Sequence, residues 1–174
     1  MNRLPSSLLD QLRGGDHRSI GRSNAVAQAV LRGPERFPEL LAGLWHPDPL
    51  VRMRSGDALE KVSREHAEWF RPVRRELLEL AQATTEQETR WHLAQILPRL
   101  RLRGIQRTTL LTLLRRYRQD ESAIVRVCAL EGLAVLAALD PALMSTVRRE
   151  VERALKQGSA AEQARARRLR SRLG

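Results

Sequence analysis

The stretch HPDPLVRMRSGDALEKVS, residues 46–63, has two later counterparts in the chain, QETRWHLAQILPRL at residues 87–100 and AIVRVCALEGLAVL at residues 123–136. Two weaker counterparts are SIGRSNAVAQAV and EQARARRLRSRL. One arginine aligns in all five segments: Arg22, Arg52, Arg90, Arg126 and Arg165. Successive arginines are 30, 38, 36 and 39 residues apart, a period typical of proteins built from stacked helical pairs. This repeat decides the predicted fold.

Helix start signals accompany several of these segments, because the free amides of a first turn need acceptors. Three pairs have N-cap or capping-box spacing: Asp48 with Pro49, Thr85 with Glu88, and Ser159 with Glu162. Amphipathic stretches that favour partner helices fill the intervals, at residues 38–45, 69–83, 105–117 and 142–157. No strand pattern competes with them. The sequence therefore predicts an all-α protein, an α-solenoid (α-α superhelix) of about five two-helix repeats.

Residues 46–63 and 87–100 resemble HEAT repeats, in which an acidic turn, an apolar residue and an arginine open the second helix. The resemblance extends from about Ser19 onward, and the chain looks like a small bacterial HEAT-repeat protein. It implies a role in binding partners and brings no catalytic residues, because the family is defined by its fold. The predicted arrangement is one domain, 1–174, with an N-terminal capping unit, three central repeats and a C-terminal capping repeat at 1–34, 35–66, 67–103, 104–140 and 141–174.

The 174-residue chain has 31 basic and 20 acidic residues and a formal net charge of +11. Such an excess favours polyanionic ligands such as nucleic acid. Only Lys61 and Lys156 are lysines, so a GC-rich genome is an alternative explanation for the arginines. No window approaches the roughly 18 apolar residues of a membrane span, and we expect a cytoplasmic protein without a membrane partner. The single cysteine, Cys128, stands in an apolar run and is expected to be buried and inert.

Two clusters of basic residues are candidates for binding a polyanion. Seven arginines lie between residues 99 and 118 with no acidic residue among them, and the outer side of the predicted helix 142–157 adds three basic residues. The candidates are Arg99, Arg101, Arg103, Arg107, Arg115, Arg116, Arg118, Arg149, Arg153 and Lys156. Such a strip would bind phosphates by releasing counterions, whereas the alternative is an ordinary solvated surface. Tyr117 is the only aromatic residue inside the first cluster, which argues against stacking of single-stranded bases.

The aligned arginines have two interpretations. Guanidinium groups suit phosphate oxygens, but one arginine at each repeat boundary is better explained as a structural tie between neighbouring loops. A separate candidate surface for a protein partner consists of mixed-charge residues expected on the concave side of the second helices. Its members are Asp57, Glu60, Lys61, Arg64, Gln95 and Glu131.

No catalytic, cofactor-binding or metal-binding residue is predicted. The histidines are scattered, one cysteine cannot form a thiolate cluster, and no glycine-rich loop with a lysine is present. HEAT-like DNA glycosylases that excise alkylated purines share the resembled fold and have a tryptophan and a carboxylate on one helix face. Here the residue four positions after Trp91 is Gln95, which carries no charge. This departure argues against glycosylase activity.

Two functions therefore stay open. The first is a non-catalytic HEAT-repeat scaffold that binds a protein partner of unknown identity. The second is a nucleic-acid-binding solenoid for DNA or RNA, with a DNA-repair-type, alkylpurine glycosylase-like role as its distant extension. A continuous positive strip would favour the second function, whereas arginines paired with acidic residues would assign the charge to solubility. The sequence does not indicate the oligomeric state.

Overall fold

The computed structural model describes residues 7–16 and 19–173, and every regular element in these ranges is helical. The all-α prediction is thereby confirmed for the described residues. Within them, each helix is too short or too polar to cross a bilayer. The chain forms two compact units, Met1–Phe70 (unit 1) and Arg71–Gly174 (unit 2). The prediction of a single domain stays a prediction.

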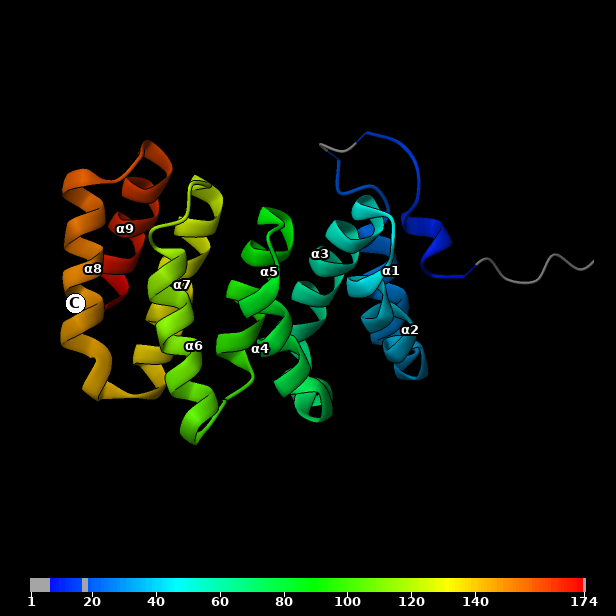
Figure 1. Cartoon of the computed structure of the whole chain (residues 1–174), viewed down its shortest axis with the longest axis horizontal. Helices are drawn as coiled ribbons and strands as arrows, with labels where there is room; N and C mark the ends of the chain where they lie inside the picture. Colours follow the sequence, from blue (N-terminus) through cyan, green and yellow to red (C-terminus); the bar gives the residue numbers. More distant parts are fainter. Residues whose placement is uncertain (1–6, 17–18, 174) are drawn as a thin grey trace, which may run out of the picture. The chain divides into compact units, whose positions relative to one another are not determined.

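Unit 1 is arranged around α3 (Pro49–Glu65), which packs against α1 (Ser23–Arg32) and the short α2 (Phe37–Ala42). The helix begins where the sequence predicts, because the Asp48 carboxylate accepts a hydrogen bond from the Leu50 amide at 2.9 Å. Phe37 of α2 lies edge-on to Phe70, with ring centroids 4.9 Å apart. Helices α1 and α2 thus both lie against α3 (Figure 1).

Unit 2 contains three successive helical pairs, which are visible in Figure 1. The pairs are α4 (Arg74–Ala83) with α5 (Gln87–Arg99), α6 (Gly104–Tyr117) with α7 (Ala123–Leu139), and α8 (Met144–Gln157) with α9 (Ala160–Leu173). Second helices also pack on one another, α5 on α7 and α7 on α9, and α4 packs on α6. Helix α7 thus contacts α5, α6, α8 and α9, and each pair covers apolar surface that its neighbour leaves open.

One glycine sets the close approach of α5 and α7. A Cβ at Gly132 would lie 2.6 Å from the backbone oxygen of Ala94, closer than real Cβ contacts. Both residues are buried, and α5 and α7 share the most extensive helix contact in unit 2. A side chain at residue 132 would push the two helices apart.

Two of the remaining predicted helix starts have different outcomes. At α9, the Ser159 amide donates to the Glu162 carboxylate at 3.1 Å and the Glu162 amide approaches the Ser159 hydroxyl at 3.4 Å, so the capping box is confirmed. The box predicted for Thr85 with Glu88 is wrong. Helix α5 begins one residue later than that spacing requires, with Glu86 as the N-cap residue.

Candidate functional site

Three of the aligned arginines hold the turn that precedes their own helix. Each guanidinium donates to a backbone oxygen six residues earlier in the chain. The pairs are Arg52 with His46 O at 2.5 Å, Arg90 with Thr84 O at 3.1 Å, and Arg126 with Asp120 O at 2.7 Å. The turns carry carbonyl groups that no helix satisfies, and the arginine supplies the missing donors. A repeated sequence position therefore has a repeated structural contact.

In unit 2 the aligned arginines also reach acidic residues of a neighbouring helical pair. The ion pairs are Arg90 with Asp120 at 2.7 Å, Arg126 with Glu162 at 3.1 Å, and Arg165 with Glu131 at 3.0 Å. These contacts favour the interpretation of the arginines as structural ties, because a guanidinium already paired with a carboxylate is a poor phosphate ligand. Arg22 differs from the others, since its side chain is exposed and has no partner among the described residues.

Glu162 is the centre of a buried ion-pair cluster that joins α6, α7 and α9. Its side chain is only 5% exposed. The carboxylate accepts a hydrogen bond from Arg118 Nη1 at 2.9 Å and another from Arg126 Nε at 3.1 Å. The Ser159 hydroxyl donates a further bond at 2.9 Å. Arg118 is 6% exposed and also donates to the backbone oxygen of Arg126 at 2.8 Å. Two arginines thus share one carboxylate away from water.

The pKa of Glu162 is set by two opposing effects. Burial alone would raise it, but hydrogen bonds from Arg126, Arg118 and Ser159 stabilise the ionised form and lower the pKa to about 2. The carboxylate therefore stays charged across the physiological pH range, and the cluster remains intact there.

Because the pKa of Glu162 is lowered in the folded protein, part of the free energy of unfolding depends on pH. An unfolded carboxylate titrates near pH 4.3, so the stabilisation is fully present above that pH and is lost as the pH falls towards 2. The full loss is about 3 kcal/mol, of which about 2 kcal/mol falls between pH 6 and pH 2.5. Urea titrations of the wild type and of Glu162→Gln between pH 6 and pH 2.5 measure it, with the difference between their unfolding free energies shrinking as the pH falls. A difference that stays constant over this range would contradict the assignment.

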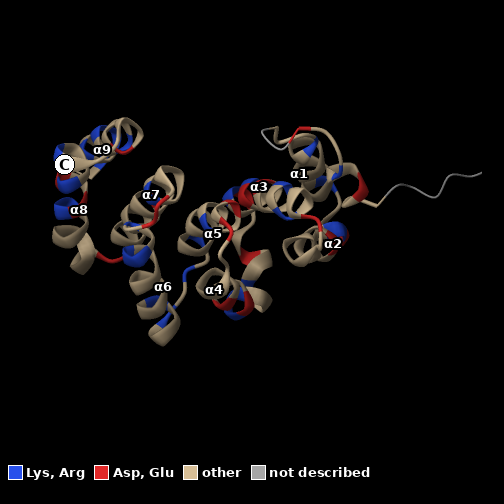
Figure 2. Ribbon diagram, turned by 45° about the horizontal axis from the view of Figure 1, so that its top comes forward, with Lys and Arg blue, Asp and Glu red and all other residues tan. Residues whose placement is uncertain are grey.

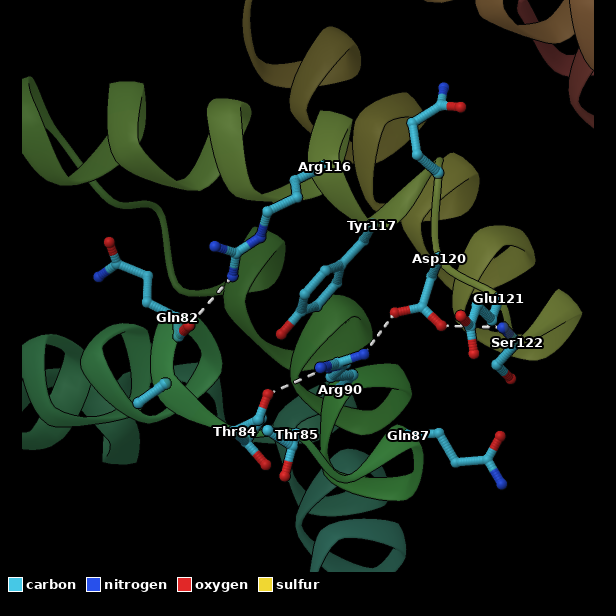
Figure 3. A pocket seen from close by; sticks show the side chains of 12 residues that line it. Gln82, Thr84, Thr85, Gln87, Arg90, Arg116, Tyr117, Asp120, Glu121 and Ser122 are labelled. Atoms are coloured by element: carbon cyan, nitrogen blue, oxygen red, sulfur yellow. Dashed lines mark hydrogen bonds and ion pairs between the residues drawn. The ribbon is translucent and has the colours of Figure 1, made fainter.

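A polar surface cleft of about 870 Å³ lies between the turn before α5 and the turn before α7 (Figure 3). Arg90 reaches across it to Asp120, and Arg116 Nη2 donates to the Gln82 backbone oxygen at 3.0 Å. The Tyr117 hydroxyl donates to a backbone oxygen of α4, and burial raises its pKa to about 12. The two arginines of the lining are matched by two acidic residues, so the cleft is electrically balanced.

The excess positive charge is concentrated in unit 2. Unit 1 has ten basic and nine acidic residues, a net charge of +1, whereas unit 2 has 21 basic and 11 acidic residues, a net charge of +10. Figure 2 shows lysine and arginine positions on α6, α8 and α9. No acidic residue occurs between Glu88 and Asp120, a stretch that contains all of α6. A compositional bias towards arginine acts on both units, but it does not explain this difference in net charge.

Six of the ten predicted polyanion-binding residues are exposed and have no acidic partner among the described residues of unit 2. We call them the basic face: Arg101, Arg103, Arg115, Arg116, Arg149 and Lys156. The first four lie at the two ends of α6 and the last two on α8. Arg118, next to the end of α6, also forms an ion pair at 3.8 Å with Glu150 of α8.

The other predicted polyanion-binding residues are not available in the same way. The prediction for Arg118 is wrong, because this side chain is buried against Glu162. Arg107 is paired with Asp140 and Arg153 with Glu150. Arg99 is half-buried. Acidic residues thus neutralise part of the arginine cluster. The residues of the basic face remain without an acidic partner among the described residues.

The predicted partner-binding residues do not form an open surface. Asp57, Glu60, Lys61 and Arg64 belong to unit 1, whereas Gln95 and Glu131 belong to unit 2. Glu60 is buried, and Asp57 accepts hydrogen bonds from Ser23 and Lys61. Both carboxylate oxygens of Glu131 are engaged by arginines of α9. Most of these charges therefore serve contacts within the fold.

Sequence reasoning missed Arg54, which is 2% exposed in α3. Its guanidinium donates to four backbone oxygens of the segment before α1, those of Leu12, Gly14, Asp16 and Ser19, at 2.6 to 3.1 Å. The signal was present, because Arg54 lies three residues after Val51 and four before Ala58 on the apolar side of the helix. An arginine in an apolar stripe must have internal partners.

Among the described residues, no three histidine, cysteine or acidic side chains lie close enough together to hold a metal ion. The Trp91 indole is partly covered and donates to His92 at 2.9 Å. Cys128 is half-buried and not buried as predicted. No protein family, curated protein or solved structure matches the chain.

Proposed function

We propose that the chain is a HEAT-like α-solenoid without catalytic activity that binds nucleic acid through the basic face of unit 2. The observation that carries this proposal is the net charge of +10 on unit 2 beside +1 on unit 1. Composition alone would give both units a similar excess. Ion pairs within the fold account for the interior arginines, and six of the predicted polyanion-binding residues remain exposed without an acidic partner among the described residues.

The physical basis of binding is counterion release. Each cation that neutralises a backbone phosphate frees condensed counterions, so affinity comes without recognition of sequence and falls steeply with salt. Six cations on successive helices would give a slope of log K against log salt of about −5. The interior network supports the same proposal, because it orders the helices before the ligand arrives and lowers the entropy cost of binding.

A matched pair of variants tests the proposal. Arg115→Gln/Arg116→Gln removes two charges from the basic face, and Arg22→Gln/Arg32→Gln removes two exposed charges from unit 1. Fluorescence anisotropy of labelled DNA and RNA oligonucleotides is measured with the full chain at about 50 and 200 mM salt. We expect the first variant to weaken binding about 10-fold and to reduce the salt slope by about 2, and the second to change the Kd less than about 2-fold. Equal effects of the two variants would mean that only overall charge matters.

A protein-binding scaffold is the second candidate, and one observation favours it. A largely apolar surface cleft of about 470 Å³ lies where the end of α7 meets the end of α9, and its lining includes Leu139, 51% exposed, with Val135 and Met144. Exposed apolar surface of this kind is typical of protein contacts. A scaffold of this type would show no salt-dependent binding of any oligonucleotide, which separates the two candidates in the same titration.

A further inference from the structure

We propose that the ligand of the basic face is a duplex, held by the phosphates of its backbone and bound with little regard to sequence. The inference rests on the proposed function and narrows the class of ligand. DNA and RNA duplexes share the phosphate chemistry that it requires. Three features of unit 2 support the inference: the burial or partial covering of its aromatic residues, the positions of the cations along α6, and the geometry of the turn before α6.

The two aromatic side chains of unit 2 are buried or partly covered. Trp91 and Tyr117 are the only tryptophan, tyrosine or phenylalanine residues in residues 71–174. Tyr117 is 2% exposed, and its hydroxyl is bonded inside the fold. Trp91 is partly covered and its indole NH is bonded to His92. Proteins that bind single strands combine a basic groove with aromatic platforms for unstacked bases. The basic face has the positive charge of such proteins but lacks their aromatic side chains.

Cations stand at both ends of the exposed side of α6. Arg101 and Arg103 precede its first turn, and Arg115 and Arg116 belong to its last turn. Between them, the exposed Thr108 and Thr112 carry no charge, and Arg107 is paired with Asp140. At 1.5 Å per residue the two groups are about 20 Å apart along the helix. The ligand must therefore present phosphates to two separate clusters.

The backbone before α6 turns both of its arginines outwards. Arg101 has a φ of 52°, in the left-handed region that residues other than glycine rarely adopt. This conformation allows Leu100 and Leu102 to be buried on either side while Arg101 and Arg103 stay exposed. Neither of the two arginine side chains has a partner among the described residues. The turn thus holds two cations in water with their backbone fixed.

Two fixed clusters at this separation favour a stiff ligand. A duplex has a persistence length of about 150 base pairs, so it reaches both clusters without being ordered by the protein. It also carries one charge per about 1.7 Å of axis, against about 3.4 Å for one strand, and releases more counterions at each contact. A single strand would have to be ordered between the clusters with no stacking energy in return.

The test compares ligands and variants on the full chain. A labelled duplex of about 20 base pairs, roughly two helical turns, is titrated beside its single strands, a shuffled duplex and an RNA duplex of the same length. We expect the duplexes to bind about 10-fold more tightly than the single strands, and the shuffled duplex to match the original within about 2-fold. The DNA and RNA arms identify which duplex is preferred.

Removal of either α6 cluster should affect duplexes most. Arg101→Asn/Arg103→Gln and Arg115→Gln/Arg116→Gln are each expected to reduce the duplex salt slope by about 2, and the combined variant to bring the duplex Kd to that of a single strand. Asparagine tolerates the left-handed backbone at residue 101, and circular dichroism verifies folding. Single strands that bind as tightly as duplexes would overturn the inference and leave the proposed function standing. Absence of binding to every oligonucleotide would overturn both.

Discussion

Replacing Glu162 by glutamine is expected to lower the free energy of unfolding by about 4 kcal/mol at pH 7. The carboxylate is the shared acceptor of Arg118 and Arg126, at 2.9 and 3.1 Å. A glutamine keeps the shape and one acceptor but removes the charge. Two guanidinium groups, one of them nearly fully buried, would then lose their shared carboxylate, and Arg118 would keep only the more distant Glu150, at 3.8 Å. Leaving buried charges unpaired costs more than losing an ordinary hydrogen bond.

Urea unfolding followed by circular dichroism measures this change. Glu152→Gln is the matched control, because it makes the same chemical change on an exposed side chain of α8 that has no partner among the described residues. The control is expected to alter stability by less than about 0.5 kcal/mol. If Glu162→Gln gave a similarly small change, the buried cluster would not hold α9 against α6 and α7 in solution.

The sequence predicts local features of the structure well. The arginine period indicates where second helices begin, and Asp48 and Ser159 identify helix starts because capping depends on residues within one turn. The contacts of Arg118 could not be predicted in this way. It follows Arg115 and Arg116 in an unbroken basic run, yet its partner Glu162 is 44 residues away. Sequence pattern shows that a charge is present but not which distant charge it meets.

The same limit explains why the predicted partner surface failed to appear as an open face. Glu60 and Glu131 lie on helix sides whose rotation sets their exposure, and hydrophobic periodicity does not fix that rotation closely. The sequence also gives no signal for the boundary after Phe70, because the repeat continues across it without a linker. The sequence contains every charged residue. The difference in net charge between the two units, however, becomes apparent only when the boundary between them is known.

Replacing Arg54 by methionine is expected to destabilise unit 1 by about 4 kcal/mol and to release the segment before α1. Arg54 Nη1 donates to Leu12 O at 2.7 Å and to Gly14 O at 2.6 Å, and Nε donates to Ser19 O at 3.1 Å. Gly21, at a φ of 52°, lets the segment bend around the guanidinium, since a Cβ there would lie 2.7 Å from Arg54 Cζ. Methionine fills a similar volume but offers no donor to these carbonyls.

Two measurements separate a local from a global effect of Arg54→Met. Urea unfolding gives the change in stability, and amide hydrogen exchange shows whether residues 7–16 lose protection. Arg32→Met on α1 is the control, because that arginine is exposed and its side chain has no partner among the described residues. Faster exchange in residues 7–16 with no loss of global stability would mean that the segment is held by Arg54 but does not support α3. If Arg54→Met matched the control in both measurements, water would be replacing the arginine at its carbonyls, and the buried guanidinium would have no structural role. A large loss in both, with the control unchanged, would show that one arginine inside the apolar side of α3 replaces the hydrogen bonds that the segment before α1 cannot make for itself.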